Sequence, residues 1–275
     1  MELTSPQIIK NLFSEHGAKP NKRLGQNFLI DKNILRKIIE SADIKPTDTI
    51  IEVGPGIGTL TQALAEKSGR VIAVEKDEKM IKILKETLKD YKNVEIIHGD
   101  ILKTTKLQIS NYKVVANIPY YLTSPLIRKF LERPNGYPES PESMVLMLQK
   151  EVAQIICAKP PNMSILAVSA QFYANAKIIS YVSKNCFLPA PKVDSAVIKI
   201  IPHNKYNMPA DLFFKIVKAG FSHPRKQLLN NLAAGLKLDK IKIGTLLSEN
   251  NIKPTQRAET LSVDDWKNLA RMLIT

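Results

Sequence analysis

The sequence is poor in the side chains that form crosslinks or bind metals. Its 275 residues include two cysteines, Cys157 and Cys186, and both lie among apolar neighbours, as buried free thiols do. The four histidines are scattered, with no second ligand at the spacing of a helical metal site. We therefore expect neither a disulfide framework nor a metal centre.

Long apolar runs are also missing. No stretch is long enough to span a bilayer, and the N-terminus has no apolar core of the kind found in signal peptides. Glu2 and Glu15 argue against a transit peptide, because such peptides are poor in acidic residues. We expect a soluble cytoplasmic protein, with a monomer as the default state.

Basic residues, in contrast, are in excess. Lysine and arginine number 40 against 26 acidic residues, which gives a net charge of +14 and a pI near 9.6. This balance favours a polyanionic partner, with nucleic acid as the leading candidate, although a protein that needs only solubility can carry a similar charge. The length is sufficient for one α/β domain and a smaller second domain.

The most informative segment is a glycine-rich stretch between a predicted strand and a predicted helix. Residues Ile50 to Gly58 read Ile-Ile-Glu-Val-Gly-Pro-Gly-Ile-Gly, and Glu75 ends the next apolar run. A strand, a tight glycine loop and a helix in this order are typical of a nucleotide-binding fold. The dinucleotide signature G-x-G-x-x-G is not matched, because the third glycine comes one residue early and Thr59 holds the last place. For the glycines alone, an ordinary turn is the alternative.

A ligand without a pyrophosphate suits this loop better than a dinucleotide does. S-adenosylmethionine is such a ligand, and its ribose hydroxyls need an acceptor that Glu75 supplies at the tip of the second strand. Gly54 and Gly56 then line the cofactor. Asp100, after the third strand, can accept a hydrogen bond from the adenine amine, although it is equally well explained as a turn former. The first hypothesis is therefore a methyltransferase that uses S-adenosylmethionine.

Strand and helix patterns alternate through most of the chain, which predicts a Rossmann-like α/β sheet that is mostly parallel. The β-rich segments Ile165 to Ala174 and Val193 to Ile201 are predicted to pair with each other as an antiparallel edge. Helical spacing then predicts a small all-helical domain. Its expected helices are Asp211 to Phe221, Lys226 to Leu236, Lys240 to Glu249 and Val263 to Ile274. We expect a methyltransferase domain at residues 1–205, with residues 1–24 mobile, and a helical domain at 206–275.

The segment Asn117-Ile-Pro-Tyr-Tyr121 follows a predicted strand, where open α/β sheets place their active sites. The exocyclic amine of adenine is a poor nucleophile, so its methylation needs acceptors for the amine hydrogens. The Asn117 oxygen and a nearby main-chain carbonyl can accept them, while Pro119 stiffens the backbone. Tyr120 offers a stacking face for a base taken out of its helix. Alternatively, Asn117 caps the next segment and the tyrosines are core or surface residues.

These residues and further motifs resemble the ribosomal RNA adenine dimethyltransferase family over nearly the whole chain. Residues Lys22 to Asp31 resemble its N-terminal signature, and the resemblance implies that Asn27 and Leu29 lie against the cofactor. The positions that match the family's other cofactor contacts are Gly54, Glu75, Asp100 and Asn117. A further family motif, near the target base, is matched by Phe187, Pro189, Pro191, Val193 and Ser195.

Two C-terminal motifs, Phe221 to Leu232 and Arg257 to Ser262, resemble the small-subunit branch of the family. The resemblance implies transfer of two methyl groups to N6 of each of two adjacent adenosines in a hairpin near the 3′ end of 16S rRNA. It also implies that the substrate is an assembling small ribosomal subunit, whose maturation the protein assists. One departure is Pro160 to Leu166, where the family commonly has Tyr-Gly-Xaa-Leu, and it puts the RNA contacts of this loop in doubt.

Three basic residues, Lys192, Arg225 and Lys226, are predicted to contact RNA phosphates, with solvated charges at helix ends as the alternative. Two other functions stay open. A large-subunit rRNA dimethyltransferase of the erythromycin-resistance type shares the first half of the motifs, but the motif after Phe221 weighs against it. A non-catalytic RNA-binding assembly factor would explain the charge, but the intact loop at Asn117 weighs against it.

Overall fold

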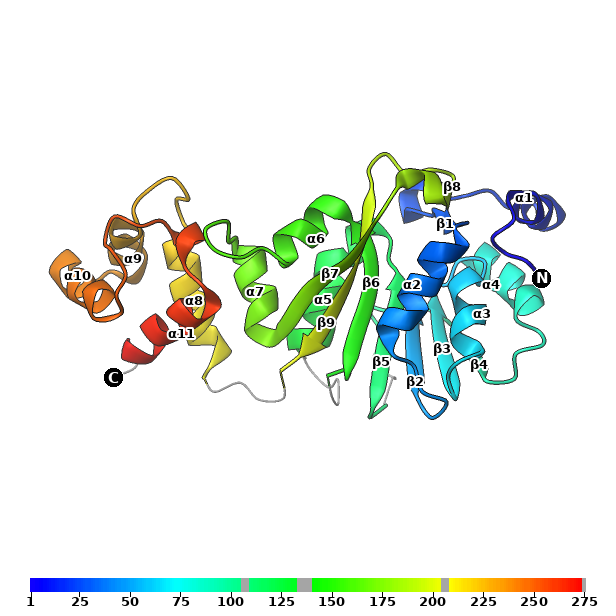
Figure 1. Cartoon of the computed structure of the whole chain (residues 1–275), viewed down its shortest axis with the longest axis horizontal. Coiled ribbons are helices and arrows are strands. Elements are labelled where there is room, and N and C mark those ends of the chain that lie inside the picture. Colours follow the sequence, from blue (N-terminus) through cyan, green and yellow to red (C-terminus); the bar gives the residue numbers. More distant parts are fainter. Residues whose placement is uncertain (105–108, 133–139, 204–207, 274–275) are drawn as a thin grey trace. The chain divides into compact units, whose positions relative to one another are not determined.

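The computed structural model describes residues 1–104, 109–132, 140–203 and 208–273. Packing divides the chain into two compact units (Figure 1). The first comprises Met1–Ala153 and Ala176–Pro202, and the second comprises Gln154–Asn175 and His203–Thr275. Residues 154–175, which we expected in the first domain, thus pack with the C-terminal helices. The expected boundary between residues 205 and 206 lies outside the described residues.

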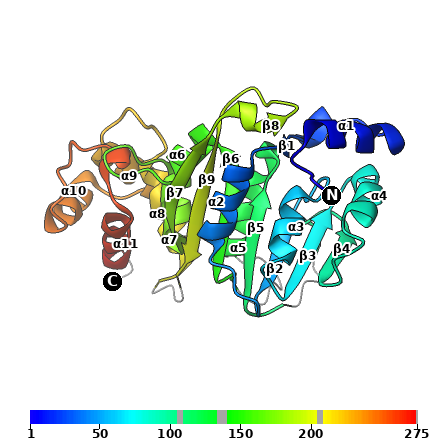
Figure 2. The same cartoon turned by 45° about the vertical axis from the view of Figure 1, so that its right-hand side comes forward.

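Seven strands of the described chain form one sheet in the order β4-β3-β2-β5-β6-β9-β7 (Figure 2). They are β2 (Thr49–Val53), β3 (Arg70–Glu75), β4 (Val94–His98), β5 (Tyr112–Asn117), β6 (Ser143–Gln149), β7 (Ala174–Val182) and β9 (Ser195–Pro202). Strands β2 to β6 pair in parallel, and β9 pairs antiparallel with β6. The predicted Rossmann-like sheet, mostly parallel with an antiparallel edge, is confirmed.

Helices cover both faces of this sheet, because its strands carry apolar side chains on both sides. The helices are α2 (Lys32–Ala42), α3 (Thr59–Ala65), α4 (Glu78–Thr87) and α5 (Thr123–Glu132). Ile38 of α2 packs in one core with Ile50 of β2 and Val115 of β5. On the opposite face of β5, the ring centroid of Tyr112 lies 6.3 Å from that of Phe130 in α5.

The order of the parallel strands reverses next to β2. From β2 the chain moves outward to β3 and β4, and it then returns to place β5 and β6 on the other side. In open α/β sheets, a ligand binds outside the carboxyl ends of the strands at such a reversal. Gly54, Glu75 and Asn117 stand at these ends, at the position predicted for the functional residues.

One predicted strand is a helix. Residues Ile165–Tyr173 form α7, which is capped by Ser164, whose side chain accepts a hydrogen bond from the Ala167 N–H. The expected pairing of this segment with the strand at Val193 to Ile201 is therefore wrong, and β9 lies between β6 and β7 instead. Helix α7 packs against α8 and α11, and its residues are apolar on most sides. A short sequence that is apolar throughout does not distinguish a buried helix from a strand.

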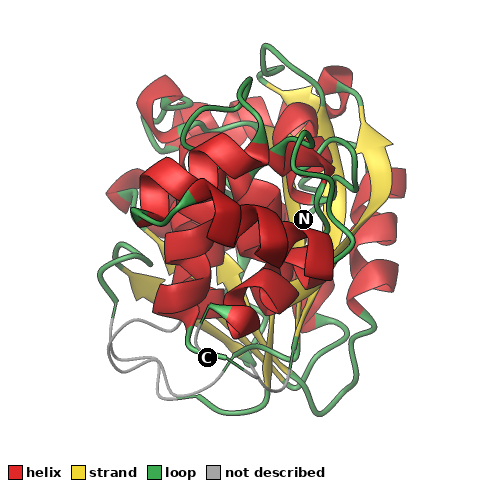
Figure 3. Cartoon of the chain, turned by 90° about the vertical axis from the view of Figure 1, so that its left-hand side faces the viewer, coloured by secondary structure: helices red, strands yellow, loops and turns green. Residues whose placement is uncertain are grey.

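The second unit is built from helices (Figure 3). They are α7, α8 (Ala210–Gly220), α9 (Leu228–Leu236), α10 (Lys240–Glu249) and α11 (Val263–Met272), while α6 (Lys150–Ile156) crosses the boundary between the units. The helices expected at the C-terminus are present, and Ile274, the predicted end of the last one, lies outside the described residues. Phe172 stacks on Phe213 with 4.1 Å between ring centroids. In the described ranges, no helix has the length and apolar character needed to cross a membrane.

The N-terminal segment is packed within the first unit, and the expected mobility of residues 1–24 stays a prediction. Pro6–Glu15 form α1, and a 3-10 turn at Lys22–Leu24 leads to β1 (Phe28–Leu29), which pairs with β8 (Phe187–Leu188). The apolar side of α1 is buried against Ile57 and residues of α4. We call residues 1–29 the N-terminal arm. The polar and basic composition of this segment did not indicate the amphipathic helix that it contains.

Replacing Leu12 by alanine tests this packing. Leu12 of α1 is 2% exposed, so its truncation leaves a cavity and should lower the free energy of unfolding by about 2–4 kcal/mol in chemical denaturation. Ser14→Ala, on the exposed side of the same helix, should change it by less than about 0.5 kcal/mol. Equal stabilities of Leu12→Ala and the wild type would show that the arm is not packed in this way.

Candidate active site

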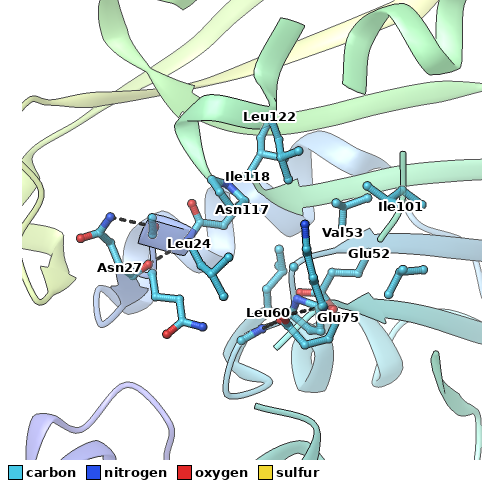
Figure 4. A pocket seen from close by; sticks show the side chains of 18 of the residues that line it. Leu24, Asn27, Glu52, Val53, Leu60, Glu75, Ile101, Asn117, Ile118 and Leu122 are labelled. Carbon is cyan, nitrogen blue, oxygen red and sulfur yellow. Dashed lines mark hydrogen bonds between the residues drawn. The ribbon is translucent and has the colours of Figure 1, made fainter. Parts of the chain in front are cut away.

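One pocket lies at the carboxyl ends of β2, β3 and β5 (Figure 4). Its walls come from the N-terminal arm, from the glycine loop after β2 and from the segments that follow β3, β4 and β5. The predicted site residues that line it are Asn27, Leu29, Gly54, Gly56, Glu75, Asp100, Asn117, Pro119, Tyr120 and Phe187. The fold thus gathers residues that are distant in the sequence around one cavity.

The glycine loop has a backbone conformation that other residues adopt rarely. Gly54, Gly56 and Gly58 have positive φ angles of 69°, 61° and 94°. At Gly56, an added Cβ atom would lie 2.9 Å from the ring of Phe28, so the loop and the N-terminal arm meet only because this residue is glycine. The Gly54 N–H donates to the Val74 carbonyl at 3.0 Å, which ties the loop to β3.

The carboxylate of Glu75 accepts hydrogen bonds from three backbone N–H groups. Gly56 donates to Oε2 at 3.1 Å, while Lys76 and Asp77 donate to Oε1, each at 2.8 Å. Burial raises the pKa of Glu75, and the three donors oppose this rise. Because a carboxylate has about four acceptor sites, Glu75 can also accept a hydrogen bond from a hydroxyl group of a ligand in the pocket.

Glu52 is a pocket residue that the sequence interpretation missed. It lies in β2, is 1% exposed and lines the pocket with Glu75 (Figure 4). Within the described chain, its Oε2 atom has no hydrogen-bond partner, and neither has the hydroxyl of Thr61. Burial, reinforced by the charge of Glu75, raises the pKa of Glu52 to about 8. The sequence signal was a single carboxylate inside an otherwise apolar strand.

Asp100 lines the pocket and also shapes a turn. Its Oδ2 lies 3.0 Å from Nζ of Lys76, and its Oδ1 accepts a hydrogen bond from the Leu102 N–H at 3.0 Å. Burial alone would raise the pKa of Asp100, but Lys76 and the Leu102 N–H together hold it below its ordinary value. Both roles considered for Asp100 are therefore compatible with its position.

Asn117 and Tyr120 are held from two sides. Nδ2 of Asn117 donates to the Asn27 carbonyl at 3.2 Å, which leaves Oδ1 as an acceptor at the pocket (Figure 4). Tyr120 begins the short turn Tyr120–Leu122, and its hydroxyl lies 2.9 Å from Oγ of Ser195. Burial raises the pKa of Tyr120, so the phenol stays neutral. The candidate catalytic loop is thus fixed by the arm and by β9.

The N-terminal signature at Lys22 to Asp31 and the motif that begins at Phe187 meet because β1 pairs with β8. This pairing places Leu29 opposite Phe187. The other predicted substrate residues, Pro189, Lys192, Arg225 and Lys226, are not part of the pocket lining. Lys192 is exposed in the first unit, whereas Arg225 and Lys226 are exposed in the second. Their contact with RNA stays a prediction.

The sheet, the glycine loop at the strand reversal and the carboxylate at the next strand tip define a Rossmann-like methyltransferase. The family model for ribosomal RNA adenine dimethylases matches residues 17–274. The chain therefore belongs to the ribosomal RNA adenine dimethylase family, and it is an rRNA adenine dimethyltransferase.

Relatives and solved structures agree with this family. A ribosomal RNA small subunit methyltransferase A of Dehalococcoides mccartyi is 48% identical over 267 residues, covering 94% of this chain and 90% of the relative. A relative of the same name from Alkaliphilus metalliredigens is 42% identical over 283 residues, covering 98% and 97%. The crystal structure of a Plasmodium falciparum dimethyladenosine transferase has a TM-score of 0.73 at 29% identity, covering 88% of this chain and 95% of that one.

A second crystal structure shows the same fold in a different methyltransferase. The 23S rRNA methyltransferase ErmE has a TM-score of 0.76, covering 90% of this chain and all of its own. Its sequence is 24% identical, so this likeness concerns the fold alone. The fold is therefore shared between enzymes whose names give different ribosomal RNA targets.

The buried carboxyl of Glu52 predicts a pH dependence of stability. The folded protein holds this proton up to about pH 8, whereas the unfolded chain releases it near pH 4.5, so the free energy of unfolding should fall as the pH rises between these values. Glu52→Gln removes the titrating group, and chemical denaturation at pH 5 and at about pH 8 should show a smaller loss than in the wild type. Glu15→Gln, at an exposed position, should follow the wild type. Identical pH dependences for Glu52→Gln and the wild type would contradict a neutral Glu52.

Proposed function

We propose that the enzyme uses S-adenosylmethionine to dimethylate N6 of two adjacent adenosines in a hairpin near the 3′ end of 16S rRNA. The reaction takes place in the cytoplasm, on a small ribosomal subunit during its maturation. The relatives in Dehalococcoides and Alkaliphilus, which are named as small-subunit methyltransferases, support this target. The observation that carries the proposal is the Asn117 oxygen, an acceptor beside Tyr120 at the pocket.

The pocket residues fit S-adenosylmethionine. Glu75 offers a carboxylate to the ribose hydroxyls, and Asp100 at the next strand tip offers one to the adenine amine. The unpartnered Oε2 of Glu52 fits the positively charged amino group, because a nearby cation favours the ionised carboxylate and supplies the missing hydrogen bond. When bound, the cofactor supplies an activated methyl group on a sulfonium centre.

Asn117 prepares the amine of the target adenine. The lone pair of this amine is delocalised into the ring, and an acceptor for its hydrogens favours the pyramidal nitrogen that can attack a methyl group. The Asn117 oxygen can accept one of these hydrogens and stabilise the positive charge that develops on nitrogen. The hydrogen bond to the Asn27 carbonyl fixes the orientation of the amide before the base arrives. No general base is needed, because the proton can leave after methyl transfer.

Tyr120 and Phe187 hold the base. An adenine must leave its helix to reach the pocket, and stacking on an aromatic side chain contributes about 1–3 kcal/mol to holding it there. The hydrogen bond to Ser195 orients the ring of Tyr120, and buried Phe187 forms an apolar wall of the same pocket. Stacking is independent of the sequence of the RNA, so the choice of particular adenosines within the RNA requires contacts outside the pocket.

The alternative target is the large-subunit RNA, which the fold shared with ErmE allows. The C-terminal motif at Phe221 to Leu232 favours the small subunit. Incubation with labelled S-adenosylmethionine and either small subunits that lack the modification or protein-free large-subunit RNA distinguishes the two. Label in the small subunits alone supports the proposal, and label in the large-subunit RNA alone overturns it.

Replacing Asn117 by alanine tests the chemistry. Loss of a hydrogen bond that strengthens in the transition state should lower kcat by roughly 10²-fold or more. The affinity for S-adenosylmethionine should change by less than about tenfold, because the arm loses one hydrogen bond to Asn117. Single-turnover kinetics and calorimetry measure the two effects. Asn268→Ala, the same truncation at an exposed position of the second unit, should turn over at the wild-type rate. A wild-type rate for Asn117→Ala would defeat the mechanism.

A further inference from the structure

A hollow in the surface of the first unit is lined by four exposed cations. Lys19, Lys22 and Arg23 come from the N-terminal arm, and Lys79 comes from the first turn of α4. None of them lies within 4.0 Å of a carboxylate of the described residues, whereas nine other lysines and arginines do. We call this site the basic hollow. Uncompensated charges gathered in a concave surface attract anions.

The arm holds three of these cations on a hydrogen-bonded loop. The Asn21 side chain accepts a hydrogen bond from the Arg23 N–H at 3.0 Å, and the Asn21 N–H donates to the side chain of Gln26 at 2.7 Å. Gly25 closes the turn with a φ of 65° and donates to the Lys22 carbonyl at 3.1 Å. The loop is therefore shaped before any ligand arrives, which reduces the entropy lost on binding.

The one carboxylate of the basic hollow is already engaged. Oδ1 of Asp77 accepts a hydrogen bond from the Lys79 N–H at 2.9 Å, and Oδ2 accepts one from Nε2 of Gln26 at 2.8 Å. Asp77 thus caps α4 and secures the loop. The four cations keep a net positive charge in the hollow.

The basic hollow and the active-site pocket share a wall. Residues 24–26 of the arm line the pocket, whereas residues 19–23 line the hollow. The same division occurs after β3, where Lys76 lines the pocket and Asp77 the hollow, and the Gln26–Asp77 hydrogen bond joins the two segments. A Cβ atom on Gly25 would lie 3.4 Å from Pro119 Cβ, so the loop directly contacts the candidate catalytic loop.

We propose that the basic hollow binds the phosphate backbone of the substrate RNA, next to the nucleotide whose base enters the pocket. This inference rests on the proposed function. Phosphates carry one charge per nucleotide, and lysine and arginine contacts to them fix the register of a protein on RNA without reading its sequence. The hollow would therefore position the strand while the pocket receives the base, and it would raise affinity for RNA without contributing to methyl transfer.

A charge-matched pair of triple variants tests the basic hollow. Lys22→Glu/Arg23→Glu/Lys79→Glu reverses three of its cations. Lys67→Glu/Lys89→Glu/Lys92→Glu makes the same change in net charge on exposed lysines that precede β3 and β4, at the amino ends of these strands and away from their carboxyl ends. Filter binding to small subunits that lack the modification gives Kd at several salt concentrations. Calorimetry gives the affinity for S-adenosylmethionine, and thermal unfolding confirms that both variants fold.

The hollow variant should bind subunits at least about tenfold more weakly than the control variant. The slope of log Kd against log salt should fall by about 0.7 for each phosphate that the variant no longer binds. KM for subunits should rise, while kcat and the affinity for S-adenosylmethionine stay at wild-type values. Equal weakening in both triple variants would overturn the proposal, because net charge alone would explain it. Inorganic phosphate that binds the hollow, with subunit affinity unchanged in the hollow variant, would also overturn it by identifying a site for free anions.

The proposed function can fail separately. A wild-type protein that methylates neither small subunits nor large-subunit RNA would defeat that function. A wild-type protein that methylates small subunits, alongside a hollow variant with unchanged Kd and KM, would defeat the basic hollow alone.

Discussion

The site depends on the Glu75 carboxylate, which binds backbone N–H groups of Gly56, Lys76 and Asp77. These bonds join the end of β3 to the glycine loop after β2, and they fix the loop in its positive-φ conformation. The ring of Phe28, which belongs to the N-terminal arm, packs so closely against Gly56 that an added Cβ atom would lie 2.9 Å from it. In the arm, the Asn27 carbonyl accepts a hydrogen bond from the side-chain amide of Asn117. One buried carboxylate therefore aligns three segments around the methyl-transfer site.

Around the active site of the first unit, two carboxyl groups are buried and the positive charges of the basic hollow are exposed. Two carboxyls, Glu52 and Glu75, are buried in the pocket, and burial raises the pKa of both. The cations of the basic hollow, in contrast, lie exposed on the other side of the pocket wall. A cationic cofactor lowers the cost of the buried carboxylates, and a polyanionic substrate compensates the exposed cations. Part of the excess of basic residues is thus gathered at one site, the basic hollow, in addition to its effect on solubility.

Much of this architecture is predictable because local patterns agree with it. The glycine loop, Glu75 and the segment after Asn117 all follow strands, and the parallel sheet brings strand ends together. The sequence does not distinguish helix from strand over Ile165–Tyr173, because contacts with α8 and α11 require apolar residues on several sides of this helix. The hydrogen bond from Asn117 to Asn27, the contact of Tyr120 with Ser195 and the pairing of β1 with β8 join distant segments, and no spacing in the sequence predicts them. Asn27 itself was found only through the family resemblance.

The most direct test of the central claim is nucleoside mass spectrometry of rRNA. The purified protein is incubated with S-adenosylmethionine and small subunits from a strain that lacks the modification, and the digested 16S rRNA is analysed by fragment. The account predicts N6,N6-dimethyladenosine at two adjacent positions in a fragment near the 3′ end. Absence of dimethyladenosine from the 16S rRNA, with cofactor binding shown by calorimetry, would contradict it.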